Sequence, residues 1–352
     1  MKRVDRNDLT LIRRLSPLVG VDYPVVKRAE DVPPRARLKI YGGAARAANA
    51  RGLDSITLSR SGRAGNNIIQ LVQGLIIAEQ AKIPVLRHRF DMFGHGPRAA
   101  PVRLKFGKPR SWSAEVGLRG RFFLRGQSAY LRQLNAKTFL ETLDRYARPA
   151  FRWRTPPEAG LLALNLRGGT DIFAQSVPPS QYGQPPLSYY IAAAETAMAA
   201  HDIKRIAIVH QDNLNPVLPG LIQWAENTSL PTTCISSGPE GDARTLLAAE
   251  HIVMGCTTFT ESLSLLSDGL ISLSTFGTQH LVEMLDLAVP VRRRFEDDGT
   301  YQPTKIWTGS PEQRNQMVTF PLSALSMTEE RHPEASLRRE RLRTAPKRWP
   351  WS

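Results

Sequence analysis

The stretch LLALNLRGGTDIF, residues 161–173, decides the fold. It begins as a short apolar run with the length and composition of a buried strand, and it then breaks into two glycines that follow an arginine. Such a strand would hold the arginine in place, the glycines would let the backbone approach a ligand, and the guanidinium would match phosphate oxygens. The stretch therefore predicts a phosphate-binding strand end built on Arg167, or else an ordinary strand end where Arg167 pairs with Asp171 on the surface.

Strand and helix patterns alternate after this stretch, which predicts an α/β domain with a mainly parallel sheet. The expected strands are 161–166, 205–209, 231–236, 251–256 and 270–273, and the expected helices are 188–200, 215–226, 243–249 and one from 261. An earlier strand–loop–helix–strand pattern at 55–86 predicts a second parallel α/β layer.

The 352 residues are too many for one ordinary core and favour two domains. Prolines at 149, 156 and 157 indicate a linker between them. We expect an N-terminal α/β domain at 1–155 with a basic Gly/Pro/Arg-rich insertion at about 94–127, a Rossmann-like domain at 156–326 and a basic tail at 327–352.

The charge balance favours an anionic partner, since 47 Lys and Arg residues against 32 Asp and Glu residues give a net charge of +15. Basic residues cluster in 98–132 and in the tail, where Trp349 and Trp351 follow them. Basic residues beside tryptophans suit an anionic membrane surface, although a solvated tail or nucleic-acid contact would also explain them. Without a secretory signal or a long apolar run, we expect a cytoplasmic protein that contacts the membrane peripherally. Cys234 and Cys256 lie in apolar runs and are expected to be reduced, buried thiols.

Polar clusters follow three of the expected strands, at 167–171, 210–213 and 257–261. Because the carboxyl ends of parallel strands share one edge of a sheet, these clusters should converge. Thr258 and Glu261 have the spacing of a capping box at a helix start. Such a hydroxyl-rich helix start can hold a phosphate, or it can be a plain cap.

In the first half, a glycine-containing loop opens directly onto a helix start, a suitable place for an anion or for sugar hydroxyls. Its spacing is not that of a dinucleotide-binding loop. His88 and Asp91 follow the next strand and could line a cleft, although a lone histidine is more often structural.

Three stretches together resemble the fucosyltransferase superfamily, which includes bacterial α-1,2- and α-1,6-fucosyltransferases and protein O-fucosyltransferases. They are SGRAGNNIIQ at 61–70, NLRGGTD at 165–171, and the segment from Asp242 that continues through Thr257 to Ser262. In addition, 209–212 stands where many members have a Ser-Asp-Asp-like strand end. The sequence departs from the family at Asn165, where histidine is usual, and in the longer turn at 169–171.

The resemblance implies a GT-B fold, in which two Rossmann-like domains face each other across a cleft. It also implies inverting transfer of a sugar, with GDP-fucose as the first choice of donor, to a glycan or lipid-linked glycan in surface or secreted polysaccharide biosynthesis, without metal or cofactor. By this resemblance Arg167 and Asp171 are catalytic. The donor side would comprise Asn165, Gly168, Gly169, His210, Asp212, Asp242, Thr257, Thr258, Phe259 and Ser262. The acceptor side would comprise Gly62, Arg63, Gly65, Asn66 and Asn67. His88 and Asp91 join this side as candidates because of their place after a strand, not because of the resemblance.

Two points stay open. The general base could be Asp171, His210 or Asp91. The protein could also be a catalytically silent nucleotide-sugar or glycan-binding protein on the same fold, or a basic nucleic-acid-binding protein. We do not expect nucleic acid as a partner, since few aromatic residues lie among the arginines of 98–132.

Overall fold

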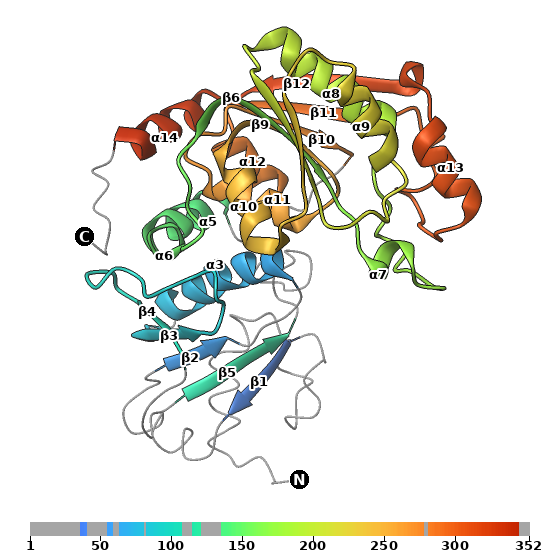
Figure 1. The fold of residues 1–352 in the computed structure, drawn as a ribbon. Coiled ribbons are helices and arrows are strands. Elements are labelled where there is room, and N and C mark those ends of the chain that lie inside the picture. The colour runs from blue at the N-terminus through green and yellow to red at the C-terminus, as the bar shows by residue number, and fades with distance from the viewer. Residues whose placement is uncertain are drawn as a thin grey trace. The chain divides into compact units, whose positions relative to one another are not determined.

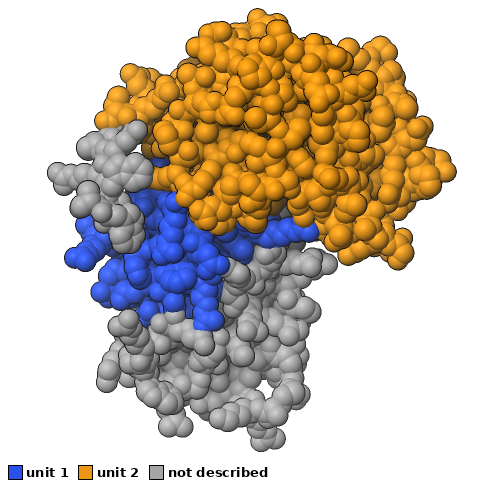
Figure 2. All heavy atoms as spheres, in the orientation of Figure 1, with its two compact units in different colours: residues 1–152 blue, residues 153–352 orange. Residues whose placement is uncertain are grey.

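The computed structural model forms two compact units, residues 1–152 and residues 153–352 (Figure 2). The structure describes residues 36–40, 55–58, 63–80, 82–107, 115–120, 135–277 and 281–344, with the backbone alone at 36–40 and 115–120. Each unit contains a sheet with helices, so the expected α/β class is confirmed.

Unit 1 contains a five-stranded sheet in the order β1-β5-β2-β3-β4, in which only β1 is antiparallel to its neighbour (Figure 1). The strands are β1 Ala36–Ile40, β2 Ser55–Leu58, β3 Val85–His88, β4 Arg103–Phe106 and β5 Glu115–Gly120. Helix α3, Ala64–Gln80, joins β2 to β3 and buries its apolar residues, which recur at helical spacing. A later helical segment consists of α5 Ala136–Thr142, η4 Leu143–Ala147 and α6 Arg148–Ala150.

The basic segment at 94–127 was predicted as an extended loop or small insertion, and this was wrong, because it supplies β4 and β5 to the sheet of unit 1. The alternation in β4 explains the error. Leu104 is buried while its neighbour Arg103 is exposed, as expected for a strand with one covered face. Four residues of this kind contain too few apolar positions to stand out among the arginines.

Unit 2 contains a seven-stranded sheet in the order β12-β11-β10-β9-β6-β7-β8, parallel except for β12 (Figure 1). Its strands are β6 Glu158–Leu166, β7 Arg205–His210, β8 Thr232–Ile235, β9 Ala249–Met254, β10 Ser272–Phe276, β11 Val291–Asp297 and β12 Leu325–Arg331. The central strand β6 is buried on both faces from residue 160 onward, which explains its continuous apolar run.

Helices cover both faces of this sheet (Figure 1). One face carries α8 Leu187–Ala200, α9 Leu218–Glu226 and α13 Pro311–Thr319, and the other carries α10 Gly238–Ala248, α11 Thr258–Leu266, α12 Val282–Ala288 and α14 Pro333–Thr344. Alternate side chains of β6 (Leu162, Leu164, Leu166) pack in the core with Tyr189 and Tyr190 of α8. The residues of β6 between these leucines, such as Asn165, therefore point to the opposite face of the sheet, which carries α11.

The expected basic tail at 327–352 was also wrong, because β12 and α14 are ordered parts of unit 2. The charged residues of β12 made it look like a tail in the sequence, but in the structure they have partners on β11. Arg293, 1% exposed, pairs with Glu329, which stands opposite it in the antiparallel register. Helix α14 packs against α12 and places Arg338 in a buried position, where Nη2 donates to the carbonyl of Leu265. Residues 345–352 lie outside the described part.

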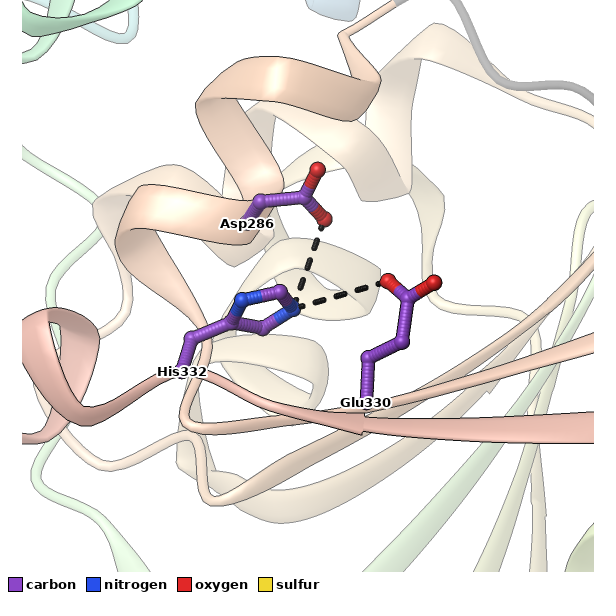
Figure 3. A group of neighbouring side chains, drawn as sticks. All are labelled: Asp286, Glu330 and His332. Atoms are coloured by element: carbon purple, nitrogen blue, oxygen red, sulfur yellow. Dashed lines mark ion pairs between the residues drawn. The ribbon is translucent and has the colours of Figure 1, made fainter.

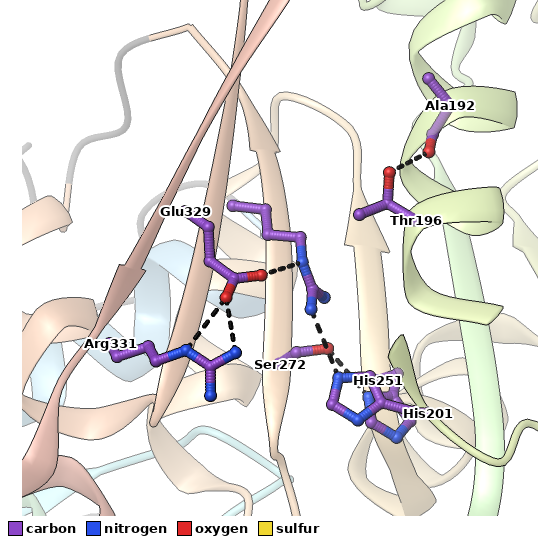
Figure 4. Close-up of polar contacts among 8 residues, drawn as sticks. Ala192, Thr196, His201, His251, Ser272, Glu329 and Arg331 are labelled. Carbon is purple, nitrogen blue, oxygen red and sulfur yellow. Dashed lines mark hydrogen bonds and ion pairs between the residues drawn. The ribbon is translucent and has the colours of Figure 1, made fainter. Parts of the chain in front are cut away.

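A buried polar network lies near the amino ends of β9, β10 and β11 (Figure 4). The rings of His201 and His251 stack at 4.2 Å, Nδ1 of His251 lies 2.8 Å from the Ser272 hydroxyl, and Nη2 of Arg293 lies 3.4 Å from Nε2 of His201. Burial, with smaller effects from His201 and the arginines, lowers the pKa of His251 to about 3. Burial and Arg293 also lower the pKa of His201.

Across the described residues, we find no helix with the length and apolar composition that crossing a bilayer requires.

Candidate functional site

The candidate site lies at the carboxyl edge of the unit 2 sheet, where the winding direction of the chain reverses. From β6 the chain adds β7 and β8 on one side, and it then crosses over to add β9, β10 and β11 on the other. In open parallel sheets, ligands bind in the crevice outside the strand ends at such a switch point. The polar segments after β6, β7 and β9 meet here, as the sequence predicted, because β6 pairs in parallel with both neighbours.

Arg167 leaves the end of β6 as a largely enclosed cation, with 16% of its side chain exposed. Its Nη2 is 3.5 Å from Oδ2 of Asp171, and its guanidinium carbon lies 4.6 Å from the ring centroid of Tyr182. Its buried Nε makes no hydrogen bond within the described residues. The contact with Asp171 is long for a charge-assisted hydrogen bond, so Arg167 retains capacity to bind an anion.

The turn after Arg167 requires its glycines. A Cβ at Gly168 would collide with the carboxylate of Asp212, and Gly169 has φ +125°, which side-chain-bearing residues rarely adopt. The short helix α7, Thr170–Phe173, begins directly afterwards. The two glycines thus bring the end of β6 close to the end of β7.

Residues from distant parts of the chain hold this turn. Nε1 of Trp307, which is 1% exposed, donates to the carbonyl of Ile172 at 3.0 Å. Nη2 of Arg314 donates to the carbonyl of Phe173, and Nδ2 of buried Asn215 donates to the carbonyl of Arg167 at 2.9 Å. None of these three contacts was predicted, because nothing in the local sequence pattern links Trp307, Arg314 or Asn215 to the turn.

Asn165 has a structural role in this arrangement. Its Oδ1 accepts from the Thr260 hydroxyl at 2.5 Å, and its Nδ2 donates to the carbonyl of Val209 at 3.3 Å. The side chain is buried and joins β6 to β7 and to α11. Both of its polar atoms have partners inside the protein, which is a different position from the ligand-contacting one that the resemblance implied.

Helix α11 begins at the site, but its cap differs from the predicted one. Thr257, not Thr258, is the N-cap, with an extended backbone and a hydroxyl that accepts from the amide of Phe259 at 3.1 Å. The predicted capping box starting at Thr258 was therefore one residue late. The hydroxyl of Ser262 donates to the carbonyl of Thr258 at 2.7 Å, so it stabilises the first turn of the helix.

Cys256 directly precedes this cap, and the charged groups at the sheet edge affect the pKa of its thiol. Burial raises the pKa of its thiol to about 12; buried Glu261 adds to this effect and Arg167 opposes it. The guanidinium and the Glu261 carboxylate therefore act on the same small region. Glu261 was not among the predicted site residues, although its place in a helix start is the signal that could have found it.

The strand end of β7 brings two predicted residues together. Nδ1 of His210 lies 3.2 Å from the carbonyl of Asp212, whose carboxylate accepts from the amide of Leu214 at 3.0 Å. Asp242, in the first turns of α10, accepts from the amide and the hydroxyl of Ser237. Burial raises the pKa of Asp242, while the Ser237 hydrogen bonds and then nearby His210 oppose that effect.

The predicted acceptor-side residues of unit 1 lie in different environments, and one of them lies outside the described residues. Gly62 lies outside the described residues, Arg63 is exposed immediately before α3, and Gly65, Asn66 and Asn67 lie in the first turn of that helix. The expected loop is therefore shorter than predicted, because the helix begins at Ala64. Asp91 is exposed in a turn.

His88 is a fully buried structural residue rather than a cleft residue. Its Nε2 donates to the carbonyl of Gly94 at 3.1 Å, which leaves Nδ1 to accept from the amide of Phe90 at 3.3 Å. Aromatic rings surround it, and burial lowers its pKa to about 4, so the neutral form persists. These contacts account for His88 completely without a ligand.

Comparison with family models and with curated proteins found no match to this chain. The edge itself combines an enclosed arginine, a glycine turn and the start of α11. Together these groups can hold an anionic group such as a phosphate.

Proposed function

We propose that this chain is an inverting, metal-independent glycosyltransferase with a GT-B arrangement, which transfers a sugar, first of all fucose from GDP-fucose, to a glycan or lipid-linked glycan. The observation that carries the proposal is Arg167, an enclosed guanidinium at the switch point whose Nε lacks a partner within the described residues. The donor diphosphate would bind there. The cytoplasmic setting at a membrane and the role in surface polysaccharide synthesis belong to the same proposal.

The chemistry needs a positioned cation at this place. Negative charge develops on the nucleotide diphosphate as the bond from the sugar to its oxygen breaks, and a cation that is already oriented stabilises that charge. Tyr182 and the carbonyl contacts of the turn restrict where Arg167 can move. The long contact to Asp171 can be exchanged for phosphate oxygens, which form shorter bidentate bonds with arginine.

The remaining donor contacts follow from position. The start of α11 lies at the same edge, where the helix dipole favours an anion. Asp242 and His210 lie at the next strand end and would contact the ribose or the base. The candidates for the general base are Asp171, His210 and Asp91.

The test compares the parent with Arg167→Ala and Arg167→Lys in thermal shifts with GDP, GDP-fucose and UDP, and in release of GDP from GDP-fucose. Arg244→Ala is the matched control, since Arg244 is an exposed arginine of the same unit that pairs with Glu240. We expect a selective shift with GDP that Arg167→Ala removes and Arg244→Ala preserves. Equal shifts and turnover in all four proteins would end the proposal.

A catalytically silent nucleotide-sugar-binding protein is the second candidate. The internal hydrogen bonds of Asn165 favour it, because the residue that stands in place of the family histidine is used for structure. Binding of GDP-fucose that depends on Arg167, without hydrolysis or transfer to any acceptor, would select this candidate. Turnover at any rate that Arg167→Ala abolishes would select the enzyme.

A further inference from the structure

Three side chains with metal-binding atoms meet away from the switch point, near the start of β11 (Figure 3). Asp286 belongs to α12, Glu330 to β12, and His332 follows β12 directly. Their ligand atoms lie within 4.8 Å of one another. Nε2 of His332 is 3.5 Å from Oδ1 of Asp286 and 3.8 Å from Oε2 of Glu330.

The 3.5 Å separation between His332 and Asp286 suits two ligands of one cation better than a direct ion pair, whereas the half-exposed Glu330, at 3.8 Å, would have to move closer to bind the same ion. A direct charge-assisted hydrogen bond would bring nitrogen and oxygen to about 2.7–2.9 Å. Two ligands of a tetrahedral zinc ion, each about 2.0–2.1 Å from the metal, lie about 3.3–3.4 Å apart. Nε2 of His332 is buried and makes no hydrogen bond in the described part of the chain, although both carboxylates face it.

The surroundings already orient these groups. The amide of His332 donates to the carbonyl of Pro290 at 2.8 Å, which fixes the backbone that carries the ring. Arg292, 3% exposed, donates to Oδ1 of Asp286 and to the carbonyl of Val282. Hydrogen-bonded carboxylates are usual among metal ligands, and the two carboxylates carry more negative charge than the Arg292 guanidinium balances.

We propose that Asp286, Glu330 and His332 form a zinc-binding site. One imidazole with two carboxylates is a ligand set that zinc accepts, and a water molecule would complete the tetrahedron. The metal would join α12 to the end of β12 at the residue before α14 begins. Because the site is distant from Arg167 along the sheet, its role would be structural and independent of the proposed transferase activity.

The test uses untagged full-length protein, stripped with a chelator and titrated with Zn²⁺ by calorimetry, and with Co²⁺ by visible absorption. We expect one equivalent of Zn²⁺, a rise in melting temperature, and Co²⁺ bands typical of four or five ligands. Glu330→Gln and His332→Ala should each weaken binding at least about tenfold. His95→Ala, at an exposed histidine of unit 1, is the matched control and should bind as the parent does.

Glu330→Gln keeps the proposal testable, because Glu330 has 46% of its side chain exposed and its replacement should leave the fold intact. Absence of saturable Zn²⁺ binding to the parent would overturn the proposal. Binding that Glu330→Gln and His332→Ala leave unchanged would also overturn it, since the metal would then bind elsewhere.

Discussion

The hydroxyl of Thr260, in the first turn of α11, donates a 2.5 Å hydrogen bond to Oδ1 of Asn165 at the centre of the sheet. Thr260→Val keeps the shape and removes the donor, which leaves a buried acceptor without its partner. We expect a loss of about 1–3 kcal/mol in the free energy of unfolding, measured with urea. Thr319→Val, at an exposed threonine of α13, is the control and should stay within about 0.5 kcal/mol of the parent. Equal effects would show that the Asn165 contact contributes nothing.

Gly168 lies so close to Asp212 that a substitution at Gly168 should destabilise unit 2, and a second substitution at Asp212 should restore much of the stability. Gly168→Ala should destabilise unit 2 by about 1–3 kcal/mol and weaken donor binding, because the added Cβ collides with the Asp212 carboxylate. In Gly168→Ala/Asp212→Ala that carboxylate is gone, and much of the stability should return. Urea unfolding of the four proteins of this cycle measures the coupling. Strict additivity would contradict the close approach.

Trp307 should matter to the site as well as to the core. Trp307→Phe leaves the carbonyl of Ile172 without its donor and a small cavity beside it, at a cost of about 2 kcal/mol. Since Ile172 belongs to the turn that follows Arg167, GDP affinity should also fall. Trp224→Phe is the matched control, because Trp224 is a half-buried residue beside the same core, and its Nε1 donates to exposed Glu195 at 3.4 Å rather than to the turn. A loss of GDP affinity in both variants would contradict the specific role of Trp307.

The stacked histidines predict that stability falls with acid. The folded-state pKa of His251 is about 3 and its ordinary value is 6.5, so the unfolded state binds more protons between these values. The free energy of unfolding should therefore be greatest above about pH 6.5 and decrease below it, by at most about 1.4 kcal/mol per pH unit for this histidine. Urea midpoints between about pH 4.5 and 7.5 test this. In His251→Asn the slope should be shallower, and an unchanged slope would assign the effect elsewhere.

The two cysteines should differ in reactivity. With its pKa raised to about 12 by burial, Cys256 is a thiolate in about one molecule in ten thousand at pH 8. Cys234 is exposed, so the expectation of a buried thiol was wrong at this position. Partial desolvation and then nearby Glu226 raise its pKa. Iodoacetamide should label Cys234 first, as followed by mass spectrometry, and Cys234→Ser should label very slowly. Rapid labelling of Cys256 in the folded protein would contradict its burial.

Local pattern was enough to predict five of the seven strands of unit 2 and the helices α8 to α11, but it missed β11, β12, α12, α13 and α14. The run at 161–166 is apolar because β6 is covered on both faces, and the helices repeat apolar residues at helical spacing. Convergence of the polar strand ends followed from parallel pairing alone.

Contacts that join distant residues could not be predicted in this way. β12 resembled a solvated tail because its acidic residues are balanced by arginines of β11, a relation visible only once the strands pair. The partners of Asn165 lie on a helix and a strand far along the chain, so its residue type alone suggested ligand contact.

The hydrogen bonds that hold the Arg167 turn also determine when this turn can reach its final structure during synthesis. β6 and its arginine leave the ribosome well before Trp307 and Arg314, which hold the carbonyls of Ile172 and Phe173. A nascent chain that ends before these residues has the strand and the glycines, but Arg167, the proposed anion-binding residue, lacks its final support. The proposed anion-binding site is therefore completed late in translation, after the segment that carries α13 has emerged.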